Sequence, residues 1–122
     1  MKCRKVNNDT LEVYDAEKLL FTLSEKISDG VMIISLSGQL SNIGISEFED
    51  EVMAALTVCR KLRLDFSGVT YIASGVLRVL LSVQQVIDGI EGAEMVLTGV
   101  TNEVMNTLQE VGFDEILEIE KA

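Results

Sequence analysis

The side chains best suited to chemistry gather in one segment, residues 65–75 (DFSGVTYIASG), which contains Asp65, Ser67 and Ser74. A serine hydroxyl becomes a nucleophile when a neighbouring base takes its proton, and it can also accept a phosphate. The chain contains no histidine, so neither a Ser-His-Asp triad nor a Cys-His pair can form within it, and most zinc sites are excluded. An enzyme would need Asp65, Ser67 or Ser74 to act with a lysine. We favour a protein that is not an enzyme.

Cofactor and metal sites are also disfavoured. Neither the phosphate-loop pattern GxxxxGK[ST] nor the dinucleotide pattern GxGxxG occurs in the sequence. The acidic residues at 47, 49, 50 and 51 follow Ser46, and Ser46 with Glu49 matches the capping box that begins a helix. Carboxylates are favourable in a first helical turn, whereas hard cations need oxygen ligands that converge from a loop. We therefore predict no metal and no cofactor.

Composition and charge limit the kind of partner. The chain has 122 residues, enough for one domain with its own core, and a net charge of −10, which disfavours nucleic acid and anionic membrane surfaces. No apolar run approaches the roughly 20 residues that cross a bilayer, and no apolar signal-peptide core follows the basic N-terminus. Cys3 and Cys59 form no motif and suit a reducing compartment. We expect a cytoplasmic protein with a protein partner, and a homodimer is compatible with the sequence.

The apolar pattern predicts alternating strands and helices. Residues 20–27 and 31–36 read as strands, and Asp29-Gly30 between them predicts a hairpin that makes them antiparallel neighbours. There follow a helix from Ser46, a strand at 62–66, a helix at 74–90, a strand at 93–99, a helix capped by Thr101 or Asn102, and a short closing strand at 116–119. Residues 1–18 are weakly patterned and are interpreted as a tail or an added edge segment.

This order predicts an α/β fold. Because a helix joins the strands at 62–66 and 93–99, these two strands should be parallel. The whole is an α/β sandwich on a mixed sheet of about five strands with three to four helices, formed by residues 19–122. Ser67-Gly68 is interpreted as the turn that ends the first of these strands, and Ser74 either caps the following helix or offers an anion site at its N-terminus. On physical grounds alone we favour the cap.

The segment LDFSGVTYIASGVLRVLLSVQQ, residues 64–85, resembles the signature of the STAS domain. This domain occurs in bacterial anti-sigma factor antagonists, stressosome subunits and the cytoplasmic tails of sulfate transporters. Its members show a strand ending in Asp-Leu-Ser, an aromatic or apolar pair, a hydroxyl-rich run that ends in glycine, and a leucine-rich helix. Residues 31–40 (VMIISLSGQL) resemble the family's early strand, and Asn102, Val104, Leu108 and Gly112-Phe113 resemble its last helix and turn.

The resemblance implies a non-enzymatic STAS-like fold that binds an anti-sigma-factor kinase. In the family, phosphorylation of one Ser or Thr at the start of the central helix breaks that complex. Without a gap, the alignment places Gly75 at this acceptor, Ser74 at the serine before it, Ala73 where many members have Asp or Ser, and Val76 in place of a glycine. Glycine cannot be phosphorylated, so the usual switch is lost in this register and Ser74 is the phospho-acceptor candidate. A shift by one residue would align Ser74 with the acceptor but would misalign the flanking apolar residues, and we prefer the ungapped register.

The resemblance also indicates a partner-binding face. It comprises Ser41, Asn42, Ser67, Gly68, Tyr71, Ala73, Ser74, Gly75 and Arg78. Two alternatives to the kinase-binding antagonist stay open. One is a constitutive STAS subunit of a stressosome-like or transport complex, and the other is a module that senses an anion or nucleotide at the helix start.

Overall fold

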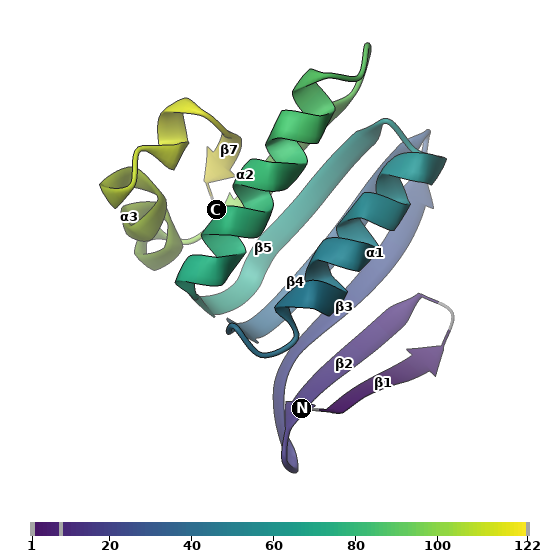
Figure 1. Ribbon diagram of the computed structural model, residues 1–122, viewed down its shortest axis with the longest axis vertical. Coiled ribbons are helices and arrows are strands. Elements are labelled where there is room, and N and C mark those ends of the chain that lie inside the picture. The colour runs from purple at the N-terminus through teal and green to yellow at the C-terminus, as the bar shows by residue number, and fades with distance from the viewer. Residues whose placement is uncertain (1, 8, 122) are drawn as a thin grey trace.

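The computed structural model describes residues 2–7 and 9–121, and its strands form one mixed sheet (Figure 1). The sheet has seven strands whose spatial order follows the chain, β1-β2-β3-β4-β5-β6-β7. The elements are β1 (Lys2–Asn7), β2 (Thr10–Asp15), β3 (Lys18–Ser28), β4 (Val31–Leu40), α1 (Ile45–Val58), β5 (Lys61–Ile72), α2 (Ser74–Asp88), β6 (Glu94–Val100), α3 (Asn102–Glu110), the short 3₁₀ helix η1 (Phe113–Glu115) and β7 (Glu118–Lys121). The predicted α/β class and element order are confirmed.

The pairing of the strands follows from how they are connected. Strands β1 to β4 are joined by short turns and pair antiparallel, which confirms the hairpin predicted at Asp29-Gly30. Strands β4 to β7 are joined through helices and pair parallel, as predicted for β5 and β6. The sheet is larger than the predicted five strands because residues 2–7 and 10–15 extend its edge as β1 and β2.

Helices α1 and α2 lie side by side across one face of the sheet (Figure 1). Alternate residues of the strands face them and are buried, as in Leu62, Leu64 and Phe66 of β5. The helices contribute further core residues: Phe48, Val52 and Ala55 from α1, and Val76, Val79, Leu80, Val83 and Ile87 from α2. Both helices begin at the same end of the sheet, where β4 and β5 end (Figure 1).

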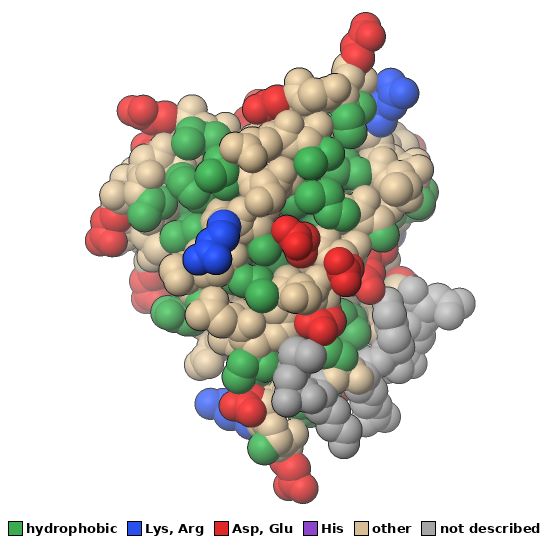
Figure 2. All heavy atoms as spheres, viewed as in Figure 1, with side chains coloured by type: hydrophobic (Ala, Val, Ile, Leu, Met, Phe, Trp, Pro, Cys, Tyr) green, Lys and Arg blue, Asp and Glu red, His purple; other side chains and the backbone are tan. Residues whose placement is uncertain are grey.

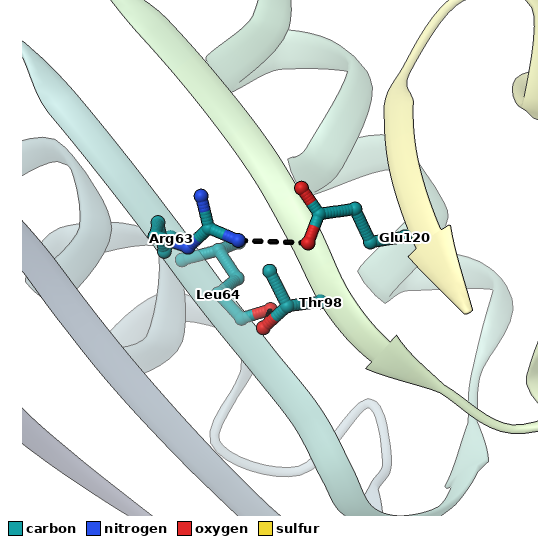
Figure 3. Close-up of polar contacts among 4 residues, drawn as sticks. All are labelled: Arg63, Leu64, Thr98 and Glu120. Atoms are coloured by element: carbon teal, nitrogen blue, oxygen red, sulfur yellow. Dashed lines mark hydrogen bonds and ion pairs between the residues drawn. The ribbon is translucent and has the colours of Figure 1, made fainter. Parts of the chain in front are cut away.

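The strand residues that alternate with these core positions point to the opposite face of the sheet. Their side chains are half-exposed and often polar. Figure 3 shows Arg63 of β5 reaching across β6 to Glu120 of β7, with 2.8 Å between Nη2 and Oε1. Beside this pair, the Thr98 hydroxyl donates a hydrogen bond of 3.5 Å to the backbone carbonyl of Leu64. The ion pair ties the short terminal strand β7 to β5 on the side away from α1 and α2, and the Thr98 bond joins β6 to β5.

The start of α1 differs from the prediction. Ser46 was expected to cap the helix, but α1 begins at Ile45, and Gly44 is the N-cap residue without a side-chain cap bond. Gly44 has a φ of 83°, a left-handed conformation that glycine adopts without strain, and its carbonyl accepts a hydrogen bond of 3.0 Å from Phe48 N–H. The helix therefore begins two residues before the start that a Ser46 cap would give. The capping-box interpretation of Ser46 and Glu49 is wrong.

The end of β5 also differs from the prediction. Ser67-Gly68 does not turn the chain, because β4 continues alongside and pairs Ser37 with Gly68 and Leu40 with Ile72. Two register shifts in this pairing absorb extra residues, as β-bulges do. A Cβ at Gly68 would lie 2.8 Å from the Ser37 Cβ, so the glycine serves a close approach of two strands. The predicted loop after residue 66 is therefore mostly strand.

The starts of α2 and α3 and the end of α3 lie where the sequence predicts them, but the cap of α2 does not. Helix α2 begins at Ser74 as predicted, but Ala73 occupies the N-cap position, so the predicted capping role of Ser74 is wrong. The Thr101 hydroxyl caps α3 by accepting a hydrogen bond from Val104 N–H. Gly112, with a φ of 76°, provides the expected left-handed residue after α3. Cys59 is buried and Cys3 is exposed.

Candidate functional site

The ends of β4 and β5 bring two separate parts of the predicted face together. Ala73 N–H donates a hydrogen bond of 2.8 Å to the carbonyl of Leu40, which extends the pairing of β4 and β5 past their last residues. One step further, Gly75 N–H donates to Asn42 Oδ1 at 3.2 Å. The loop after β4 and the first turn of α2 are thus joined directly, although 33 positions separate Asn42 and Gly75 in the sequence.

Gly75 permits this close approach. A Cβ placed on Gly75 would lie 2.5 Å from Asn42 Oδ1 and 2.5 Å from Ile45 Cδ1. Any side chain at this position must displace the Asn42 amide, the Ile45 methyl group, or both. Glycine at position 75 therefore allows the Asn42 amide to reach the first turn of α2.

A hollow opens between the first turns of α1 and α2. Its volume is about 410 Å³, and its lining combines polar and apolar side chains: Asn42, Ile45, Ser46, Glu49, Ser74, Gly75, Arg78 and Val79. Ser74 and Arg78 are exposed on the α2 wall, while Glu49 is half-buried on the α1 wall. An anion in this hollow would meet the Glu49 carboxylate as well as the Arg78 guanidinium, so the hollow is not a uniformly positive anion site.

The charges on this side of the molecule are segregated by helix. Helix α1 carries Glu47, Glu49, Asp50 and Glu51 and no basic residue, and α2 carries Arg78 near its start. Figure 2 shows acidic side chains gathered over the first half of α1 and one basic side chain beside them over the first half of α2. The Glu47 carboxylate also acts beyond its helix, because burial and this negative charge together raise the pKa of the Cys3 thiol.

Ser41 shapes the loop that leads into the hollow. Its Oγ accepts a hydrogen bond of 3.2 Å from Ile43 N–H, and the Ile43 carbonyl lies 3.3 Å from the same hydroxyl. A serine bonded to the backbone two residues on stabilises a turn in this way. Ser41 therefore holds Asn42 in position, while Asn42 itself lines the hollow.

The remaining predicted residues lie elsewhere on the same end of the sheet. Ser67 and Gly68 line a second depression of about 360 Å³, together with the start of α3. Ser67 N–H donates a hydrogen bond of 2.9 Å to Asp65 Oδ1, so this carboxylate accepts a hydrogen bond within its own strand. Tyr71 is 55% exposed and borders a third, smaller depression of about 160 Å³ beside α3. The structure thus divides the predicted face into an α1–α2 hollow and an α3 side.

Four residues of the hollow were missed by the sequence interpretation: Ile45, Ser46, Glu49 and Val79. Ser46 and Glu49 had been assigned to a capping box, and Ile45 had been left in the loop. Ile45 and Glu49 are four residues apart, so they lie on the same side of a helix that begins after Gly44. A helix predicted to begin after Ser46 does not include Ile45. The error in the helix start therefore concealed these two side chains.

Comparison with known proteins identifies relatives by sequence and by fold. The family model described as "Mlab, STAS domain" matches residues 23–118. Among curated protein sequences none matches this chain significantly. No helix within residues 2–7 and 9–121 has both the length and the apolar character of a membrane-spanning segment.

Several solved structures share the fold, and three of them illustrate the likeness. The chain superposes on a Thermotoga maritima protein provisionally assigned as an anti-sigma factor antagonist, with a TM-score of 0.75 and 24% identity over 82% of this chain and 86% of the other. An anti-sigma factor antagonist from Mycobacterium paratuberculosis gives a TM-score of 0.76 with 17% identity over 84% and 86%. The phosphorylated form of the Bacillus cell fate determinant SpoIIAA gives a TM-score of 0.63 with 12% identity over 80% and 89%.

Proposed function

Because the chain belongs to the STAS domain family, we propose that it is a cytoplasmic, non-enzymatic anti-sigma factor antagonist that binds an anti-sigma-factor kinase. The observation that carries this proposal is the α1–α2 hollow, in which Asn42, Ser74, Gly75 and Arg78 meet although they come from separate parts of the chain. Two solved structures with the same fold bear the description anti-sigma factor antagonist, one of them provisionally. The hollow and its rim are the proposed docking face.

The residues of this face favour binding over catalysis. The chain has no histidine, and the Asp65 carboxylate accepts a hydrogen bond from Ser67 N–H within its own strand. Ser74 has an exposed side chain at the first position of α2, where a partner can reach it. The face thus presents hydroxyl, amide and guanidinium groups for hydrogen bonds across an interface.

A binding assay with charge-matched controls tests the proposal. The purified chain is titrated with an ATPase-type anti-sigma-factor kinase from the same organism, and the dissociation constant is measured by calorimetry. Arg78→Glu and Ser74→Glu should each weaken the complex about tenfold or more, because each places a carboxylate in the proposed interface. Lys61→Glu, an exposed residue at the opposite end of β5, changes the net charge as Arg78→Glu does and should leave affinity within about twofold. Unchanged binding in both docking variants would remove this face from the proposal.

Regulation of this antagonist departs from the family switch. Gly75 has no hydroxyl to phosphorylate, and the Cβ of a side chain there would lie 2.5 Å from both Asn42 Oδ1 and Ile45 Cδ1. This favours a second candidate function, a constitutive STAS subunit of a stressosome-like or transport complex that binds without a phosphorylation cycle. Intact mass measured after incubation with the kinase and ATP separates the two candidates. A phosphate on Ser74 excludes the constitutive subunit, and an unmodified chain supports it.

A further inference from the structure

Strand β3 is longer than the hairpin beside it, so part of its edge is open. β3 has 11 residues and β2 has six, and their pairing ends where Thr10 meets Ser24. Among the described strands, residues 25–28 of β3 therefore pair only with β4. Figure 1 shows the β1–β2 hairpin alongside only one part of β3. A hollow of about 590 Å³ lies at the uncovered part, and it is lined by residues 24–27, Asp9, Thr10 and Met32. We call residues 25–28 with this hollow the β3 notch.

The backbone of Ile27 points into the β3 notch. Along an antiparallel strand, the N–H and C=O groups of one residue point to one neighbouring strand, and those of the next residue point to the other. Glu25 N–H donates a hydrogen bond of 2.8 Å to the Asp9 carbonyl, so Glu25 points to the β2 side. Ile27 lies two residues further on, so its backbone points the same way, past the end of the β2–β3 pairing. Its N–H and C=O can therefore pair with an added strand.

The side chains at the β3 notch alternate between the two faces of the sheet. Ile27 is 54% exposed and pairs with the core residue Met32, so it lies on the face that the helices cover. Lys26 lies on the opposite, open face, and Glu25 lies on the same face as Ile27. A strand antiparallel to β3 meets Ile27 first, then Lys26, then Glu25. The complementary sequence is an apolar residue, an acidic residue and a basic residue, in that order.

Strand β7, at the other edge of the sheet, has this complementary sequence. Its four residues equal the length of the β3 notch and are Glu118, Ile119, Glu120 and Lys121. Ile119 pairs with Leu97 of the core, so it lies on the helix-covered face, and Glu120 lies on the open face. Among the described strands, β7 is last in the sheet order and pairs with β6, so its outer edge is open.

The Glu120 carboxylate can accept a second cation. Arg63 of the same chain contacts its Oε1 atom at 2.8 Å (Figure 3). The Glu120 side chain is nevertheless 56% exposed, so another basic side chain can approach it from the outer edge of β7.

We propose that β7 of one copy of this chain docks in the β3 notch of a second copy, antiparallel to β3, and continues the same sheet. Ile119 then lies opposite Ile27 on the helix-covered face. Glu120 lies opposite Lys26 on the open face, and Lys121 lies opposite the acidic residue before Lys26. The helix-covered faces of the two copies lie on the same side of the joined sheet.

This contact joins two different surfaces, so each docked copy still presents one β7 or one β3 notch to a further copy. Heterologous contacts of this kind repeat until a ring closes or a filament forms. Short, charged edge strands resist unspecific pairing, so the association is restricted to strands with complementary charges. The β3 notch lies beside Met32 near the start of β4, whereas the α1–α2 hollow follows the end of β4. The inference therefore does not depend on the proposed kinase.

Sedimentation velocity of the full chain, from micromolar to millimolar concentration, tests this self-association. The weight-average mass of the wild type should rise beyond that of a dimer. Lys26→Glu and Glu120→Lys should each weaken association about tenfold or more, because each places like charges opposite one another. Lys18→Glu and Glu17→Lys are matched controls, because they make the same changes of net charge at exposed positions at the other end of β3. They should alter association by no more than about twofold.

A charge-swapped double variant separates a direct contact from a loss of folding. Lys26→Glu combined with Glu120→Lys keeps the net charge of the wild type and again places opposite charges across the contact. It should regain association to within about threefold of the wild type, and the thermal midpoint of each variant reports whether it is folded.

Amide hydrogen exchange measured by NMR tests the backbone part. The Ile27 N–H should exchange fast in dilute solution and slowly at high concentration, whereas the Lys26 N–H, which points to β4, should exchange slowly at both. A chain that stays monomeric at millimolar concentration overturns the inference. Association that Lys26→Glu does not weaken, that the charge swap does not restore, or that leaves the Ile27 amide in fast exchange overturns it as well.

Discussion

Replacing Gly44 by alanine tests whether the N-terminal strands support the docking face. Gly44 directly precedes α1, is buried, and has a φ of 83°. A Cβ at this position would lie 2.6 Å from Val13 Cγ1 of β2 and 3.1 Å from Phe21 Cε1 of β3. Val13 and Phe21 are 0% and 2% exposed, so neither side chain can move aside into solvent. The start of α1 therefore rests on a strand that lies outside the matched family region, residues 23–118.

Two costs add in the Gly44→Ala variant. A left-handed conformation costs an L-residue roughly 1–2 kcal/mol. Forcing a methyl group against well-packed side chains costs typically about 1–3 kcal/mol more. We expect the free energy of unfolding to fall by about 3 kcal/mol, which for a chain of this size lowers the thermal midpoint by roughly 10 °C.

Chemical and thermal unfolding of matched variants separate the two costs. Gly112 has a similar φ of 76°, but nothing lies within 4 Å of its Cβ position. Gly112→Ala should therefore lose only the roughly 1–2 kcal/mol of the backbone term. Val13→Ala removes the atom nearest the new methyl group, so Gly44→Ala with Val13→Ala should be less destabilised than the sum of the single variants by about 1–2 kcal/mol.

The reasoning is refuted if Gly44→Ala loses no more stability than Gly112→Ala. Strict additivity in the double variant would likewise show that Val13 does not limit the space above β2. Either result would mean that β2 pairs with β1 and β3 without supporting the loop from Ser41 to Gly44.

Three smaller predictions concern other parts of the chain. Burial and the Glu47 charge raise the pKa of the Cys3 thiol, so less thiolate is present at neutral pH. Iodoacetamide should therefore alkylate Cys3 more slowly than free cysteine. Glu47→Gln should speed this alkylation, and mass spectrometry measures the rate. Thr101→Ala removes the side-chain cap of α3 and should lower the free energy of unfolding, measured in urea, by about 1 kcal/mol. Thr101→Ser keeps a hydroxyl at the cap and should retain most of this stability. The side chains of Arg63 and Glu120 are 41% and 56% exposed, so Arg63→Ala should lower the free energy of unfolding by less than about 1 kcal/mol. A larger loss of stability would contradict the interpretation of this contact as a weak surface ion pair.

The architecture could be predicted because strong local patterns specify it. The Asp29-Gly30 turn fixed one hairpin, and the apolar spacing from Val76 to Ile87 fixed α2 and the face it buries. The N-terminal strands could not be predicted in the same way. Their stability comes from pairing with β3 and from burying Leu11 and Val13, which are contacts distant in the sequence.

The site was harder to predict than the fold because a glycine can serve three different structural roles. Gly68 was read as a turn residue, but it allows β5 to approach Ser37 of β4 within the sheet. Gly44 was left in a loop, but its left-handed conformation begins α1. Whether a glycine serves a turn, a helix start or a close approach depends on its neighbours in space, and these neighbours are not visible in the local sequence.

The two loops of the proposed docking face are held in place by hydrogen bonds within the chain, and this bears on the affinity expected for a partner. The hydrogen bonds Ala73 to Leu40, Gly75 to Asn42 and Ile43 to Ser41 fix both loops to the ends of β4 and β5. Ordering the backbone of a mobile loop would cost roughly 1–2 kcal/mol per residue, and a preformed face avoids this cost on binding. The same contacts oppose a side chain at Gly75, because it would have to break the Asn42 bond that joins the two loops. We therefore expect the contact that orders the proposed docking face also to disfavour a phosphorylatable side chain at position 75.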